Sequence, residues 1–118
     1  MTTEPLSIPL TSQEKKTLRG VAHHLSPVVS VGDHGVTEGV LEEADRALRE
    51  HELIKVKVHA SERADRVALI DDLLVATESA LVQIIGKVAV LYRRNPKPNQ
   101  KLSNIWRYLE TSAHPKSR

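Results

Sequence analysis

Hydrophobic residues recur at helical spacing in three segments of the chain. The segment TSQEKKTLRGVAHHL (11–25) begins with Thr11 and Glu14 in the spacing of a capping box. In TEGVLEEADRALREHE (37–52) the apolar residues keep helical spacing, and acidic residues and arginines occupy the other face. A third helix is predicted over roughly 62–79. The pattern therefore predicts three amphipathic helices.

The pattern changes to strict alternation in LIKVKVHA (53–60). The β-branched hydrophobic residues of this segment fall on one face, and Lys55, Lys57 and His59 fall on the other. This alternation is typical of a half-buried strand that presents a basic open face.

Three further segments have the composition of β-strands. VVSV (28–31) is short and rich in β-branched residues. LVQII (81–85) and VAVLYR (88–93) flank the pair Gly86-Lys87, which is typical of a tight turn between two strands.

The predicted elements have the order α-β-α-β-α-β-β. Strands separated by helices imply at least one parallel pair, so we expect an α/β fold, a two-layer sandwich with a mixed four-stranded sheet. The pattern runs over residues 11–94. Residues 1–10 are expected to form a loose N-terminus, and residues 95–118 a basic C-terminal tail. Within that tail, LSNIWRYLE (102–110) could form one or two turns of helix with an apolar face.

Composition limits the classes of protein to consider. The chain has 118 residues, of which 40% are hydrophobic and 27% charged, as expected for one folded domain. It has no cysteine, which excludes disulfides, thiolate zinc sites and cysteine nucleophiles. No apolar run approaches the ~20 residues of a membrane helix, and the first residues do not resemble a targeting segment. We therefore expect a cytoplasmic protein without a membrane segment.

Charge is distributed unevenly along the chain. Residues 1–85 have 9 basic and 14 acidic residues, a net charge of −5, whereas residues 86–118 have 8 and 1, a net charge of +7. In the first predicted helix, Lys15, Arg19 and His23 recur every four residues and would line one basic stripe. This distribution suggests an anionic partner, nucleic acid first and a membrane surface second, with a solvated tail as the alternative.

Two glycines three residues apart separate the first predicted strand from the second helix. The loop is Gly32, Asp33, His34 and Gly35, and the helix begins near Thr37. Glycines permit positive φ and close approach of another backbone, and the first turn of a helix has amide N–H groups without internal partners. Such a loop favours a bound phosphate. The alternative is a tight turn with no ligand, and the spacing is not that of a nucleotide-hydrolysing loop.

The motifs together resemble the CRM domain (chloroplast RNA splicing and ribosome maturation), in its small stand-alone bacterial form called YhbY-like. The resemblance covers residues 11–94 and is carried by LTSQEKKTLRGVAHHLSPVVSVGDHGVTEGVLEE, HELIKVKV and VQIIGKVAVLYR. It implies an RNA-binding domain whose GxxG loop is compared with that of KH domains, which clamp the nucleic-acid backbone. It also implies association with precursors of the large ribosomal subunit.

The resemblance assigns the RNA-binding residues. They are the loop, Gly32, Asp33, His34 and Gly35, and the surrounding cations Lys15, Lys16, Arg19, Lys55, Lys57, Arg93 and Arg94. Asp33 departs from the family pattern, because it places a negative charge beside the expected phosphate, and a protonated His34 could offset it. Trp106 and Tyr108, beyond the resemblance, could stack on unpaired bases or dock on protein.

The sequence contains no pattern of residues that is typical of an enzyme. The six histidines lack metal-ligand spacing, and no nucleophile is paired with a base, so we expect no catalytic residue, metal or cofactor. The prediction is a monomeric, non-catalytic protein that binds large-subunit rRNA or a pre-ribosomal particle and assists ribosome maturation. Two alternatives stay open. One is a protein-interaction module that docks through Leu102 to Leu109, and the other is an RNA-splicing factor.

Overall fold

The computed structural model of the chain describes residues 10–113, with side chains as far as residue 108. It contains four helices and four strands in these residues: α1 (Ser12–Ala22), β1 (Pro27–Val31), α2 (Glu38–His51), β2 (Leu53–Val58), α3 (Arg63–Thr77), β3 (Ala80–Ile85), β4 (Val88–Tyr92) and α4 (Asn104–Ala113). The predicted order is confirmed as far as β4. The predicted loose N-terminus, apart from its last residue, lies outside the described residues.

The four strands form one mixed sheet in the order β1-β2-β4-β3. β1 pairs with β2 in parallel, and β4 pairs antiparallel with both β2 and β3. Gly86, at φ +58, lies in the turn that joins β3 to β4. The parallel pair requires the long crossover through α2, because a tight turn cannot join parallel strands. The predicted α/β fold with a mixed four-stranded sheet is therefore confirmed.

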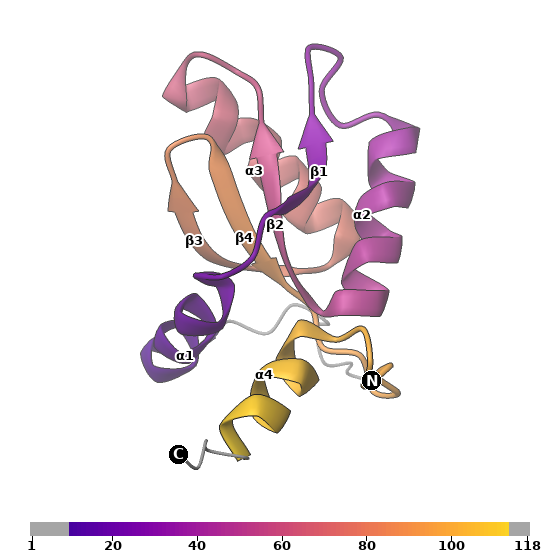
Figure 1. The fold of residues 1–118 in the computed structure, drawn as a ribbon. Coiled ribbons are helices and arrows are strands. Elements are labelled where there is room, and N and C mark those ends of the chain that lie inside the picture. Colours follow the sequence, from indigo (N-terminus) through magenta and orange to yellow (C-terminus); the bar gives the residue numbers. More distant parts are fainter. Residues whose placement is uncertain (1–9, 114–118) are drawn as a thin grey trace, which may run out of the picture.

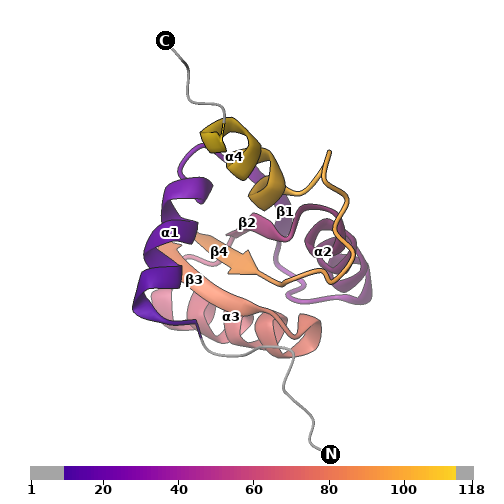
Figure 2. The ribbon, with the colours of Figure 1, turned by 90° about the horizontal axis from the view of Figure 1, so that it is seen from below.

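α2 and α3 cover one face of the sheet (Figure 2). The alternating residues of β2 that the sequence placed inward, Ile54, Val56 and Val58, are fully buried there against Leu48 of α2 and Ile70 of α3. This face and these two helices form the two-layer sandwich that the sequence predicts, and they contain the larger hydrophobic core.

The opposite face is covered only in part. Leu18 and Val21 of α1 pack on Leu53 and Val90 of the sheet, and Ile105 of α4 joins the same smaller cluster. In Figure 1, α1 and α4 lie at the lower end of the sheet, whereas the loop between β1 and α2 rises at its upper end. The two helices thus add a partial third layer that leaves the rest of this face open.

The starts of α1 and α2 follow from local capping. Thr11 Oγ1 accepts a hydrogen bond from the N–H of Glu14 (3.0 Å), and Glu14 Oε1 accepts one from the N–H of Thr11 (2.9 Å). This capping box confirms the prediction for α1. At α2, Thr37 Oγ1 accepts from the N–H of Val40 (3.2 Å). The cap fixes the position of the glycine loop that precedes α2.

The segment after β4 is longer and more ordered than the sequence suggested. Residues 95–103 turn back across the end of α2 and lead into α4, which has 10 residues instead of one or two turns. Leu102, expected on the helix face, precedes the helix, and the side chain of Leu109 lies outside the described residues. The predicted tail is therefore bound to the domain over residues 95–108.

Glu52 holds this segment in place. It is buried at the end of α2, and its carboxylate accepts hydrogen bonds from the N–H of Asn95 (3.0 Å) and from Ser103 Oγ (2.7 Å). Ser103 Oγ also accepts from the N–H groups of Ile105 and Trp106 and so caps α4. Glu52 has a positive φ of 62°, which a non-glycine residue adopts at a cost that these bonds offset.

We predict that Ser103→Ala loosens α4 while the rest of the domain stays folded. The substitution removes the cap and one donor to the buried Glu52 carboxylate, so the segment should lose about 2 kcal/mol of local stability. Hydrogen exchange should accelerate at amides of residues 95–108 and remain unchanged in β2 and β4. Ser26→Ala, at an exposed position before β1, is the control. Equal protection of residues 95–108 in the two variants would contradict the role of Ser103 in holding this segment on the domain.

Candidate nucleic-acid interface

The GxxG loop forms a tight turn at the upper end of β1. The N–H of Gly35 donates to the carbonyl of Gly32 (3.0 Å), and the N–H of Thr37 donates to the carbonyl of Gly35 (3.0 Å). Asp33 and His34 occupy the two central positions, and their side chains are exposed. Among the described residues, nothing accepts a hydrogen bond from the backbone N–H of Asp33 or His34. The turn thus presents two amides and two side chains to a ligand.

The two glycines have different structural roles. Gly35 has φ +74, and a Cβ added to it would lie 3.4 Å from Leu69 Cδ2. Gly32 has no positive φ, and a Cβ added to it would meet no atom within 4 Å. The interpretation that the glycines permit positive φ therefore applies to Gly35 alone, and no backbone atom of the described residues approaches the added Cβ at either glycine. Gly32 is available for substitutions that test binding without straining the fold.

A hollow of about 470 Å³ lies beside this turn, between the turn and α3. Gly32 and Asp33 line it on one side, and His59, Ser61 and Asp65 are among the residues on the other. Two carboxylates in one hollow oppose the entry of a phosphate. A phosphate at the turn would therefore lie on its outer side, away from this hollow.

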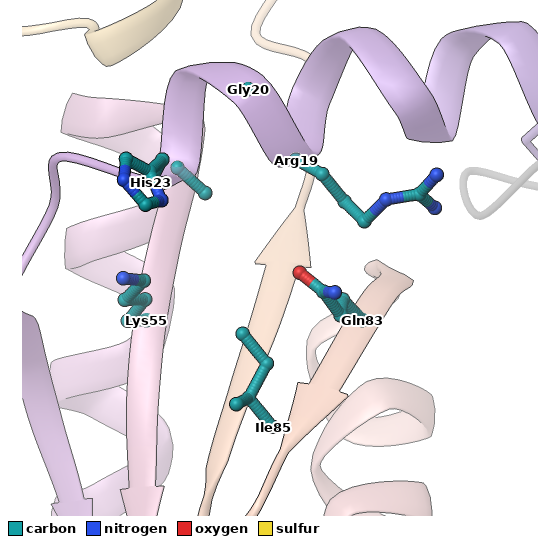
Figure 3. A pocket seen from close by; sticks show the side chains of 7 residues that line it. Arg19, Gly20, His23, Lys55, Gln83 and Ile85 are labelled. Carbon is teal, nitrogen blue, oxygen red and sulfur yellow. The ribbon is translucent and has the colours of Figure 1, made fainter.

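A second hollow, of about 340 Å³, lies between the C-terminal half of α1 and the sheet. Its lining combines three side chains that carry or can carry positive charge, one amide, one exposed aliphatic side chain and two small helix residues: Arg19, His23, Lys55, Gln83, Ile85, Gly20 and Ala22. In Figure 3 the side chains of Lys55, Gln83 and Ile85 lie beneath α1, from which Arg19 and His23 extend. No carboxylate occurs among the described residues that line it. We call it the α1–sheet hollow.

Lys57 connects the α1–sheet hollow with the glycine turn. It lies two residues beyond Lys55 on the same face of β2, and its side chain is exposed. The strand register pairs Lys57 with Ser30, which precedes Gly32 by two residues. Cationic side chains therefore follow the open face from the hollow to the turn. We call Arg19, His23, Lys55 and Lys57 the basic face.

Arg93 does not belong to this surface. Its guanidinium donates to Asp45 Oδ1 (2.9 Å), to the Asp45 carbonyl (3.0 Å) and to the Thr77 carbonyl (3.0 Å), and its side chain is 19% exposed. The hydrogen bond from Arg93 holds the pKa of the Asp45 carboxyl below its ordinary value, although partial burial opposes this effect. This side chain thus ties β4 to α2 and α3, and its predicted contact with RNA stays a prediction.

The remaining predicted cations are divided between two places. Lys16 is exposed and Lys15 half-buried on α1. Arg94 is exposed after β4, in the segment that also carries the exposed Lys97 and Lys101. This second group follows the lower end of β4, whereas the glycine turn follows the upper end of β1 (Figure 1). Arg94 therefore lies at the opposite end of the sheet from the glycine turn, although the sequence analysis grouped the two.

Sequence reasoning left His23, Gln83 and Ile85 out of the candidate site. His23 was visible in the four-residue repeat of α1, but nothing indicated that this stripe would face β3. Gln83 and Ile85 alternate on β3, which was predicted only as a strand. The three residues are brought together because α1 packs across β2 and β3.

The two described aromatic residues of α4 are exposed, whereas an aliphatic residue of this helix packs on the domain. Ile105 packs inward, while Trp106 and Tyr108 are 39% and 40% exposed. Tyr92 packs at the edge of the smaller core, where burial raises the pKa of its hydroxyl. The segment thus docks on its own domain through Ile105.

Neither a candidate metal cluster nor a candidate membrane helix occurs among the described residues. No cluster of three histidine or acidic residues that could hold a metal ion is found in them. No helix in the described part of the chain is both long and apolar enough to cross a membrane.

Comparison with known proteins relates this geometry to a family. The family model of the CRS1 / YhbY (CRM) domain matches residues 10–93. The chain belongs to the CRM domain family. The match includes the glycine turn, the basic face and all four strands, and it ends before α4.

Named relatives of this CRM domain are described as RNA-binding. A protein of Pseudomonas aeruginosa named probable RNA-binding protein PA4753 is 56% identical over 99 residues, which are 84% of this chain and 95% of the relative. The Bacillus subtilis protein named probable RNA-binding protein YqeI is 37% identical over 91 residues, 77% of this chain and 95% of that one. The solution structure of the Staphylococcus aureus protein SAV1595 matches with a TM-score of 0.68 and 36% identity, covering 80% of this chain and 97% of that one.

Proposed function

We propose that this CRM domain binds RNA through the basic face and the outer side of the glycine turn. The observation that carries the proposal is the α1–sheet hollow, whose lining contains three potential cations and, within the described residues, no carboxylate. Lys and Arg side chains supply salt-dependent attraction to phosphates, and backbone amides at a turn supply a contact of fixed geometry. The names of the relatives support RNA as the partner.

The proposal extends to a biological role. We infer that the RNA is large-subunit rRNA in a pre-ribosomal particle, and that the protein assists ribosome maturation in the cytoplasm as a single copy without catalysing a reaction. This role rests on the resemblance to stand-alone bacterial members of the family. The alternative of a protein-docking segment is disfavoured, because Ile105 of that segment packs on the protein's own core.

The test of RNA binding is a salt series with large-subunit rRNA. The wild-type protein should bind at low salt and weaken steeply as salt is added. Lys57→Gln should reduce the magnitude of the slope of log K against log salt by about 0.7–0.9, because one phosphate contact is lost. The affinity at low salt should fall about threefold.

Lys101→Gln is the matched control, since it removes the same charge from an exposed position in the C-terminal segment. It should leave the slope close to that of the wild type. If Lys101→Gln lowers the slope and Lys57→Gln does not, the C-terminal segment carries the affinity and the proposed surface is wrong. Absence of binding by the wild type at low salt would reject naked RNA as the partner.

A further inference from the structure

We propose that the α1–sheet hollow is a subsite for one unpaired nucleotide, which it holds by its base as well as by its phosphates. The inference rests on the proposed RNA binding and adds the kind of RNA that the site selects. It makes the protein a reader of single-stranded positions in a structured RNA.

The charged groups of the hollow lie on two sides. In Figure 3, His23 and Lys55 lie on one side, and Arg19 lies on the other, next to the neutral Gln83. Lys55 Nζ donates one hydrogen bond to the Leu25 carbonyl (2.9 Å), which fixes the ammonium group and leaves two of its N–H donors for a ligand. A nucleotide in a strand has a phosphate on either side of its sugar. Cations on both sides of the hollow suit this arrangement.

The middle of the hollow suits a base. Ile85 lies between these two sides in Figure 3 and is 53% exposed, so its side chain is accessible to a ligand. Its methyl groups can pack on the apolar face of a base. The Gln83 amide can donate and accept at the polar edge of the same base. A hollow that took phosphate alone would need neither of these two side chains.

Base pairing of the RNA would prevent a base from binding in the hollow. In an RNA helix the Watson–Crick edge of each base is already bonded and its faces are stacked, whereas an unpaired base can be turned outward to meet side chains. The hollow, at about 340 Å³, lies at the lower end of the range of ~300–1,000 Å³ found for small-ligand sites. It therefore has room for one nucleotide.

Two substitutions remove the base subsite without changing its charge. Gln83→Leu keeps the approximate size of the side chain and removes both hydrogen-bonding groups. Gly20→Leu adds an apolar side chain at the α1 edge of the hollow, where an added Cβ would meet no atom within 4 Å, and it replaces a helix glycine by a better helix former. Gly20→Leu therefore should not weaken the fold, which thermal unfolding would verify.

The experiment measures fluorescence anisotropy of a labelled single-stranded RNA of about 12 nucleotides, alone and annealed to its complement. We expect each substitution to lower the affinity for the single strand about tenfold and to leave duplex affinity unchanged. Gln100→Leu, the same change at an exposed position in the C-terminal segment, should bind both RNAs as the wild type does.

The outcomes separate this inference from the proposed function. Equal losses for single strand and duplex would mean that the hollow contacts phosphates only, which overturns the base subsite and keeps RNA binding. Unchanged binding of both RNAs by Gln83→Leu and Gly20→Leu would overturn the subsite as well. Failure of the wild type to bind either RNA would overturn the proposed function itself.

Discussion

Arg93→Met should lower the free energy of unfolding by about 2–3 kcal/mol. The substitution approximates the aliphatic part of the side chain but removes three hydrogen bonds, which join β4 to Asp45 of α2 and to the last turn of α3. Hydrogen bonds from a charged group contribute more than neutral ones, and the Thr77 carbonyl would lose its charged donor. The Asp45 side chain is half exposed, so its ion pair adds little to this sum. Urea denaturation measures the difference.

The neighbouring residue provides the control for this prediction. Arg94→Met removes the same charge from an exposed side chain and should change stability by less than about 0.5 kcal/mol. Equal stability of the two variants would show that the Arg93 bonds do not hold the fold together. A large loss of RNA affinity in Arg93→Met, measured where it is fully folded, would return Arg93 to the interface.

The same ion pair gives stability a pH dependence with a defined sign. The pKa of Asp45 is lowered in the folded protein, so its contribution is complete above the ordinary carboxyl value of 3.8. That contribution is lost as the pH falls through the lower folded-state pKa. The difference in the free energy of unfolding between the wild type and Asp45→Asn should therefore become smaller as the pH falls below 3.8.

Gly32→Asp should lower RNA affinity about tenfold or more while the protein keeps its stability. The new carboxylate would add a second negative charge next to Asp33 on the turn that is proposed to hold a phosphate, and like charges oppose binding. The fold should tolerate it, since the position has no positive φ and an added Cβ meets no atom within 4 Å. Anisotropy titration measures affinity, and urea denaturation should show a change below about 0.5 kcal/mol.

Two companion variants separate charge from shape. Gly32→Asn has the size of aspartate without its charge and should retain most of the affinity. Gly35→Ala should instead lower stability by about 1 kcal/mol, because its φ of +74 is unfavourable for any residue with a Cβ. If Gly32→Asp binds RNA as tightly as the wild type, the turn is structural and the phosphate contacts lie elsewhere on the surface.

Asp33 limits what the glycine turn can do by itself. Its side chain lines the hollow next to α3 together with Asp65, so the negative charge is concentrated on that side of the turn. Phosphates approaching from the open sheet face would instead meet Lys57, which pairs with Ser30 of the strand that leads into the turn. The turn and the basic face therefore act as neighbouring parts of one proposed surface.

Local sequence patterns predicted most of the fold. The capping box of Thr11 and Glu14 forms as its spacing indicates, and the alternation of β2 places Ile54, Val56 and Val58 in the core. These features are predictable because each depends on residues within a few positions of one another, where helical or strand periodicity determines which side chains share a face.

The C-terminal segment could not be predicted in this way. Its position depends on Glu52, a residue about fifty positions away from Ser103, and on Asn104, whose amide donates to the Leu53 carbonyl (2.7 Å). A polar, proline-containing stretch looks like a linker in sequence, because the bonds that fix it are made with other parts of the chain. The same is true of Arg93, which sequence alone could only classify as a cation.

The sequence by itself determined the family, the order of the elements up to β4 and the residues of the glycine turn. These features depend only on local motifs and on the periodicity of hydrophobic residues. Tertiary structure decided which cations share a surface. Packing of α1 across the sheet brings Arg19 and His23 of the helix together with Lys55 of β2 and Gln83 of β3, while Arg93 is drawn inward by Asp45. The reason is physical: which charges reach a ligand depends on how helices pack on strands, and that packing is a property of the whole chain.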